Sequence, residues 1–99
     1  MKKGTYYICI KKDGSIQALE RTGYIDGDIG ICKIGHQWVA THIPTGCMFY
    51  GERTREAAHT AAKAVMEKAT FPANVEKQMN SDAYKEWIKC VEKLKSEKP

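Results

Sequence analysis

Three short apolar runs between residues 29 and 54 decide the fold. They read IGICKIGHQW (29–38), VATHIPTG (39–46) and CMFYGERT (47–54), and an alanine-rich run follows from Arg55 to Ala69. Gly35-His36 can form a two-residue turn, and Pro44-Thr45-Gly46 a three-residue turn in which the glycine takes a positive φ. We therefore predict a three-stranded antiparallel meander over residues 29–51, with the following helix packed on one of its faces.

The two predicted turns divide the side chains of the meander between two faces. One face is nearly all apolar and is the expected seat of the helix: Cys32, Ile34, Val39, Thr41, Ile43, Cys47 and Phe49. The other face mixes apolar, aromatic and basic side chains: Ile29, Ile31, Lys33, Trp38, Ala40, His42, Met48 and Tyr50. A shift of one residue in either turn exchanges the faces, because side chains alternate along a strand.

A β-hairpin is predicted near the amino terminus, over residues 5–21. Asp13-Gly14 separates two runs rich in aromatic and β-branched residues, and such a pair favours a tight turn because both central positions need positive φ. The turn places Ile8 opposite Leu19 and Tyr6 opposite Arg21. Both sides of the hairpin are partly apolar, so we expect it to join a larger sheet. Residues 21–30, which contain three glycines and two aspartates, are expected to form a loop.

Two helices are predicted in the second half of the chain. Thr54 is a suitable N-cap for a helix over residues 54–69, whose apolar stripe comprises Ala58, Ala61, Ala62, Val65, Met66 and Ala69. Residues 72–79 are either one short helical turn or a loop. Ser81 is a second N-cap, for a helix over residues 81–95. The predicted fold is α+β: a small antiparallel sheet of three to five strands, formed by hairpin and meander, packed against two C-terminal helices.

Length and composition favour one domain over residues 1–99. The hydrophobic content of 42% is enough for a modest core, and the net charge of +4 permits an anionic partner. No apolar run approaches the roughly 20 residues of a membrane helix, and Tyr6–Ile10 is too short for a secretory signal. We therefore expect a cytoplasmic protein without membrane contact, whose four cysteines are reduced.

No catalytic or metal-binding motif is evident in the sequence. Cys32, His36, His42 and Cys47 are separated by three, five and four residues, which does not match zinc-ligand spacing. A glycine-rich phosphate loop, Gly-x-Ser-x-Gly and His-Glu-x-x-His are all missing. We therefore expect neither enzymatic activity nor a cofactor or metal ion.

The mixed face of the meander is the expected interaction surface. Lys33 lies opposite Trp38 in the predicted pairing, with His42 and Tyr50 nearby. Basic and aromatic side chains on a sheet can stack on bases and approach phosphates, and an exposed patch of this kind can equally bind a protein. The alternative is that the last helix or the amino-terminal hairpin covers this face.

The middle of the chain resembles two DNA-binding families. The residues concerned are WVATHIPTG (38–46) and YGERTREAA (50–58), which resemble the plant ethylene-response-factor domain and the arm-type domain of tyrosine integrases. Those families share a strand tryptophan, a turn, a glycine before the helix and a Thr-x-Glu-Ala-Ala helix start. The resemblance implies that the three-stranded sheet lies in the major groove with the helix behind it. Unlike the arginine-bearing strands of those families, the strands here hold only Lys33 and His42, with Arg53 and Arg55 at the junction with the helix.

These observations lead to two functional hypotheses. The first is a non-enzymatic nucleic-acid-binding module, with DNA favoured over RNA. Its predicted contacts are Lys33, Trp38, His42 and Tyr50, with Arg53 and Arg55 on phosphates. The second is a small protein-binding inhibitor or adaptor of the kind that phages and mobile elements encode, such as a counter-defence protein, acting through the same face.

Overall fold

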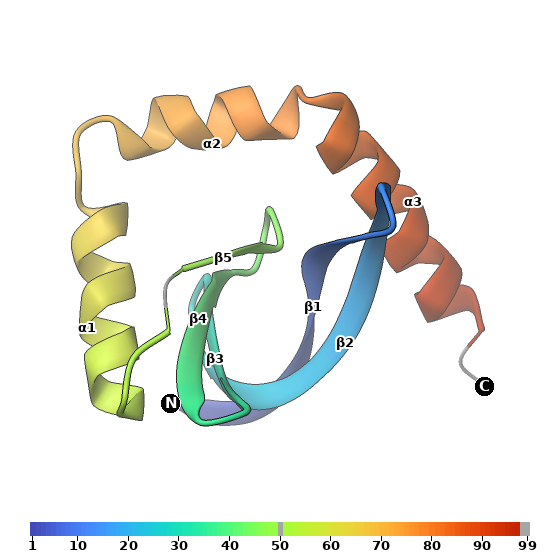
Figure 1. The fold of residues 1–99 in the computed structure, drawn as a ribbon. Helices are drawn as coiled ribbons and strands as arrows, with labels where there is room; N and C mark the ends of the chain where they lie inside the picture. Colours follow the sequence, from blue (N-terminus) through green and yellow to red (C-terminus); the bar gives the residue numbers. More distant parts are fainter. Residues whose placement is uncertain (50, 98–99) are drawn as a thin grey trace.

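The computed structural model describes residues 1–49 and 51–97, which form a five-stranded antiparallel sheet and three helices (Figure 1). The strands follow the order of the chain across the sheet: β1 (Lys2–Lys12), β2 (Ser15–Asp26), β3 (Ile29–Ile34), β4 (Gln37–His42) and β5 (Cys47–Met48). The helices are α1 (Arg55–Met66), α2 (Phe71–Met79) and α3 (Asp82–Ser96). The predicted α+β class is confirmed, with α2 added to the two predicted helices.

The β1–β2 hairpin keeps the predicted register but is longer than predicted. Asp13 and Gly14 adopt positive φ, and Tyr6 pairs with Arg21. Pairing continues to Lys2 and Ile25, so the prediction of a loop from Arg21 onward was wrong. Gly23 explains the difference: a Cβ there would lie 2.2 Å from the carbonyl oxygen of Ile31. This glycine permits a close approach of β2 to β3, so it belongs inside a strand.

The β3–β4 pairing was predicted correctly, but the next turn is one residue longer than predicted. Lys33 pairs with Trp38 across a turn in which Gly35 has positive φ. His42 then pairs with Cys47, so the turn spans four residues, 43–46. The amide of Gly46 donates to the carbonyl of His42 at 2.8 Å and closes this turn. The extra residue shifts β5, and Phe49 consequently faces the same side as Trp38.

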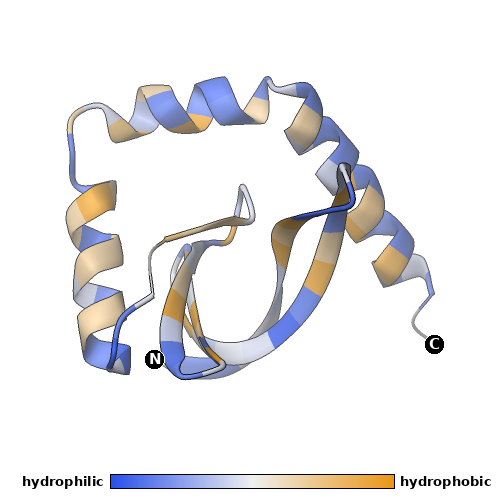
Figure 2. Cartoon of the chain, viewed as in Figure 1, coloured by the Kyte–Doolittle hydropathy of each residue, from blue (hydrophilic) through white to orange (hydrophobic). Residues whose placement is uncertain are grey.

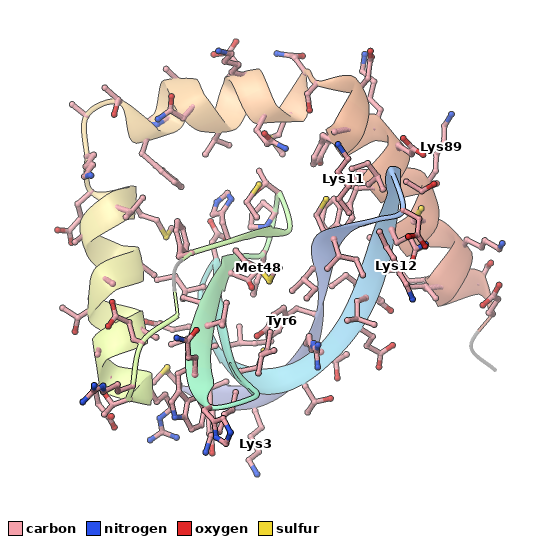
Figure 3. All side chains as sticks on the ribbon, in the orientation of Figure 1. Lys3, Tyr6, Lys11, Lys12, Met48 and Lys89 are labelled. Carbon is pink, nitrogen blue, oxygen red and sulfur yellow. The ribbon has the colours of Figure 1, made fainter. Side chains whose placement is uncertain are left out.

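The sheet curves until its two edge strands meet. The amide of Cys9 in β1 donates to the carbonyl of Gly46, just before β5, at 2.9 Å. The inner side of the curve is filled by Tyr6, Ile8 and Cys32, with Ile10, Ile25, Ile34 and Ile43 around them. Figure 3 shows Tyr6 on this inner side. The face of the meander that was predicted to seat the helix therefore packs against β1.

Helix α1 covers the opposite face, which was predicted to be free. Its Ala58 and Ala62 form one buried cluster with sheet residues Ile29, Ile31 and Ala40, bordered by Trp38, Phe49 and Met66. The small alanines let the helix backbone lie close to the sheet. The face assignment was wrong because both faces of β3 and β4 are apolar enough to be buried, and alternation alone does not tell which one meets the helix.

Helices α2 and α3 complete an arch around the sheet (Figure 1). Ser81 caps α3 as predicted, accepting from the amide of Tyr84 at 3.1 Å, and Trp87 and Val91 are its buried residues. Residues 71–79 form a helix, with Pro72 in its first turn, where a missing amide costs nothing. Hydrophilic and hydrophobic residues alternate along all three helices (Figure 2). Among the described residues, none of these helices is long and apolar enough to span a bilayer.

Candidate nucleic-acid interface

Basic and aromatic side chains from β1, β2, β3 and β4 gather near the start of α1. The guanidinium carbon of Arg55 lies 4.3 Å from the centroid of the Tyr24 ring, and Lys3 Nζ lies 5.9 Å from the same centroid. The ring of Trp38 is 6.5 Å from that of Tyr24, at an angle of 46°. Together with Lys33, which pairs with Trp38 across the strands, these residues form what we call the basic–aromatic cluster: Lys3, Tyr24, Lys33, Trp38 and Arg55.

The strand register brings the cluster together. Lys3 pairs with Tyr24, Tyr24 with Ile31, and Lys33 with Trp38. Residues that are paired or two apart along a strand share a face, so one face of four strands, β1 to β4, carries four of the five side chains. The fifth, Arg55, is the first residue of α1, which packs on that same face.

The first turn of α1 is fixed by its cap. The hydroxyl of Thr54 accepts a hydrogen bond from the amide of Ala57 at 3.1 Å, which confirms Thr54 as the N-cap. This bond sets the position from which the Arg55 side chain reaches the Tyr24 ring. A cation over an aromatic face is attracted by the ring quadrupole, so the guanidinium is held without a strong ion pair.

Carboxylates at the margin limit the positive charge of the cluster. Glu56 Oε1 lies 3.8 Å from an Arg55 amino nitrogen, but the Glu56 side chain is 77% exposed, and exposed pairs contribute little. Asp26 Oδ2 lies 2.7 Å from His59 Nε2, and this hydrogen bond lowers the pKa of Asp26. Lys3, Lys33 and Arg53 are exposed, so these cations remain accessible to a ligand.

The cluster is suited to contacting phosphates and poorly suited to stacking on bases. The Tyr24 ring is already occupied by two cations, and Trp38 packs against the core beneath α1. Fixed guanidinium and ammonium groups at a surface bind phosphate oxygens, and a guanidinium does so through two parallel hydrogen bonds. Such contacts position a nucleic acid without reading its sequence.

His42 does not belong to the accessible cluster. The register places it on the Trp38 face as predicted, but α2 covers this end of the face and leaves His42 only 5% exposed. Its ring meets that of Phe71 edge-on at 5.2 Å, and its Nδ1 lies 2.8 Å from Thr45 Oγ1. Burial lowers the pKa of His42. Its predicted role as a surface contact is therefore wrong, and Tyr50 lies outside the described residues.

His42 instead lines a cavity of about 190 Å³ between α2 and the end of the sheet. The other lining residues are Thr45, Cys47, Phe49, Phe71, Asn74, Val75 and Gln78. Sequence reasoning missed this cavity because residues 72–79 were left open between helix and loop. The spacing of Asn74 and Gln78, four residues apart, would place both amides on one side of a helix. No group of three or more histidine, cysteine or acidic side chains suited to a metal ion occurs within residues 1–49 and 51–97.

Lys3 and Tyr24 were also missed, for different reasons. Tyr24 lies in the glycine-rich stretch that was taken as a loop, and Lys3 precedes the predicted hairpin. Neither residue has a local signal for binding, because only the pairing of β1 with the far end of β2 brings them together. No family model matches the sequence, and neither a curated protein nor a solved structure shows significant similarity to it.

Proposed function

We propose that this protein is a non-enzymatic nucleic-acid-binding module that contacts the phosphate backbone through the basic–aromatic cluster. The observation that supports the proposal is the placement of Arg55 and Lys3 on one aromatic ring, at 4.3 Å and 5.9 Å. Holding a long cationic side chain in place reduces the entropy that it loses on binding. Lys33 and Arg53 are two further exposed cations, and Arg53 lies between Glu52, which pairs with Trp38, and the first residue of α1.

The mode of binding differs from the one implied by the family resemblance. One face of β3 and β4 is covered by α1, and the other is turned toward β1. A sheet face laid into the major groove is therefore not part of the proposal. Contacts to phosphates instead make the affinity strongly salt-dependent and weakly dependent on sequence. Duplex DNA is the first ligand to test, because the families that this sequence resembles bind DNA.

The decisive experiment measures the salt dependence of binding. Labelled duplex DNA, single-stranded DNA and RNA are titrated with the protein at several salt concentrations, for the wild type and for Lys3→Gln and Arg55→Gln. Each substitution is expected to weaken binding and to reduce the slope of log K against log salt by about 1. Lys77→Gln, which removes the same charge from an exposed position on α2, is the matched control.

Two outcomes would contradict the proposal. One is the lack of any binding to the three nucleic acids by micromolar protein at low salt. The other is an equal loss of affinity in Lys77→Gln, because it would show that net charge alone, and not the cluster, determines binding.

A separate observation favours the protein-binding alternative. Met48 is 42% exposed and borders a recess of about 540 Å³ between β5 and α1, which is also lined by Phe49, Glu52, Ala61 and Val65. Exposed apolar side chains around a recess are typical of protein-binding sites. A protein partner that is bound by the wild type and by Lys3→Gln, but is lost in Met48→Glu, would support this alternative.

A further inference from the structure

The cavity beneath α2 has the lining of a site for a flat aromatic ligand. Three of its wall residues carry rings: His42, Phe49 and Phe71. Its volume of about 190 Å³ is below the roughly 300–1,000 Å³ of sites for drug-sized ligands. A cavity of this size admits one ring system better than a whole nucleotide, and aromatic walls favour a ring that can stack.

One ring nitrogen of His42 in this wall has no hydrogen-bond partner among the described residues. Thr45 Oγ1 lies 3.4 Å from the carbonyl oxygen of its neighbour His42 and 2.8 Å from the ring Nδ1. The hydroxyl and the imidazole can make the shorter contact in either sense, with Nδ1–H donating to Oγ1 or the hydroxyl donating to Nδ1. In both cases Nε2 takes no part in a hydrogen bond within the described residues and is left for a ligand. Burial lowers the pKa of His42, so the neutral ring prevails at pH 7.

Two amides on α2 complete the polar part of the wall. Asn74 and Gln78 both line the cavity and lie one helical turn apart. Within the described residues, neither side-chain amide takes part in a hydrogen bond. Each amide offers a donor and an acceptor, which is the combination that pairs with N6 and N7 of adenine.

We propose that this cavity binds a single nucleobase, adenine before the others. The ring would stack against Phe49 and Phe71, Nε2 of His42 would form a hydrogen bond with the base, and Asn74 and Gln78 would meet its edge. The base comes either from an unstacked nucleotide of a strand held by the basic–aromatic cluster or from a free nucleotide. The first source rests on the proposed function, and the second does not.

Nuclear magnetic resonance tests the site directly. Adenosine monophosphate and uridine monophosphate are titrated separately into ¹⁵N-labelled protein. Saturable shifts are expected for the amides of residues 42–49 and 71–78 and for His42 Nε2, with tighter binding of the adenine nucleotide. Asn74→Ala and Gln78→Ala are each expected to weaken that binding at least about fivefold. Met79→Ala, an exposed position on the same helix that does not line the cavity, is the control.

Oligonucleotides then separate the two sources of the base. A short oligo(dA) is compared with the same strand carrying abasic sites. If the intact strand shifts the cavity resonances and the abasic strand does not, a base of the bound strand occupies the cavity. If adenosine monophosphate shifts them but no oligonucleotide binds, the ligand class stands with a free nucleotide as its source, and the proposed function fails.

The inference is overturned by either of two results. One is that no nucleotide or oligonucleotide shifts the cavity resonances, even though oligonucleotides still bind through Lys3 and Arg55. The other is that adenosine monophosphate binds equally well to the wild type, Asn74→Ala and Gln78→Ala. The first result would leave the proposed function intact.

Discussion

Trp87 of α3 lies directly against Gly46 in the turn between β4 and β5. A Cβ added to Gly46 would lie 2.3 Å from Cζ2 of Trp87, and the glycine itself has a φ of +70°. Trp87 is 3% exposed, and its indole nitrogen has no hydrogen-bond partner within the described residues. Packing on this glycine therefore holds the indole in place, and with it the docking of α3 on the sheet.

Gly46→Ala is expected to destabilise the protein by about 2–5 kcal/mol. The left-handed backbone costs a non-glycine residue about 1–2 kcal/mol, and overpacking typically adds about 1–3 kcal/mol. Gly35→Ala is the matched control, because Gly35 has a φ of +63° and open space around it. Denaturant unfolding measures both variants. Equal losses of stability would mean that the contact with Trp87 contributes nothing.

A second close approach joins Gly30 of β3 to the ring of Tyr6. A Cβ on Gly30 would lie 2.6 Å from Cζ of Tyr6, inside the curve of the sheet. Gly30→Ala is therefore expected to cost about 1–3 kcal/mol through overpacking. In a double-mutant cycle of unfolding free energies, Tyr6→Leu should relieve part of this cost. Strictly additive effects of the two substitutions would contradict the contact.

Tyr6→Phe is expected to leave stability unchanged or to raise it. The hydroxyl is buried beside the thiol of Cys32, a weak partner, and meets no oxygen or nitrogen partner within the described residues. Burial is the main reason that the pKa of Tyr6 is raised. Removing a buried polar group that lacks a good partner removes its desolvation cost. A loss of more than about 1 kcal/mol on denaturant unfolding would reveal a hydrogen bond to the hydroxyl.

The start of α1 is expected to depend on the Thr54 hydroxyl. Thr54→Ala removes the acceptor for the amide of Ala57 and should cost about 1 kcal/mol of unfolding free energy. Thr54→Ser keeps a hydroxyl and should cost much less. Because the cap positions Arg55, Thr54→Ala is also expected to weaken nucleic-acid binding, and similar binding by all three proteins would argue against that coupling.

The stability of the protein is expected to fall as the pH drops from 7 to 5. Burial, the largest influence, lowers the pKa of His42 below its ordinary value of 6.5, and Asp28 opposes this in part. The unfolded chain therefore binds a proton at His42 more readily than the folded chain does. The contribution of the neutral His42 to stability is complete above about pH 6.5 and is lost as the pH falls through that value. Denaturant unfolding at several pH values should show a shallower loss for His42→Gln. An NMR titration that places the pKa of His42 at or above 6.5 would contradict this.

Local signals in the sequence predicted the elements and several of their ends. Asp13-Gly14 and Gly35 mark turns because they adopt positive φ, and Thr54 and Ser81 cap helices because their hydroxyls accept amide hydrogens. The glycines at 23 and 30 were misread for the opposite reason. They lie in strands, where they permit close contact with Ile31 and Tyr6, and a sequence does not show which atoms lie across from a glycine.

The candidate interface was predicted only in part. Lys33, Trp38 and Arg55 lie in one cluster, as the strand pairing and the helix start indicated. Tyr24 and Lys3 join them through the far end of the hairpin, and His42 is removed by α2. These differences depend on pairings and packing between segments far apart in the chain.

The sequence alone determined the α+β class, the β3–β4 register and the helix caps, because these depend on alternation, turn residues and hydroxyl groups within a few positions of one another. Only the tertiary structure decided which face of the sheet meets α1. Both faces of β3 and β4 are apolar, and the curvature that brings Cys9 to Gly46 buries one of them against β1. The alanine stripe of α1 then packs on the other, and the cations collect at its edge.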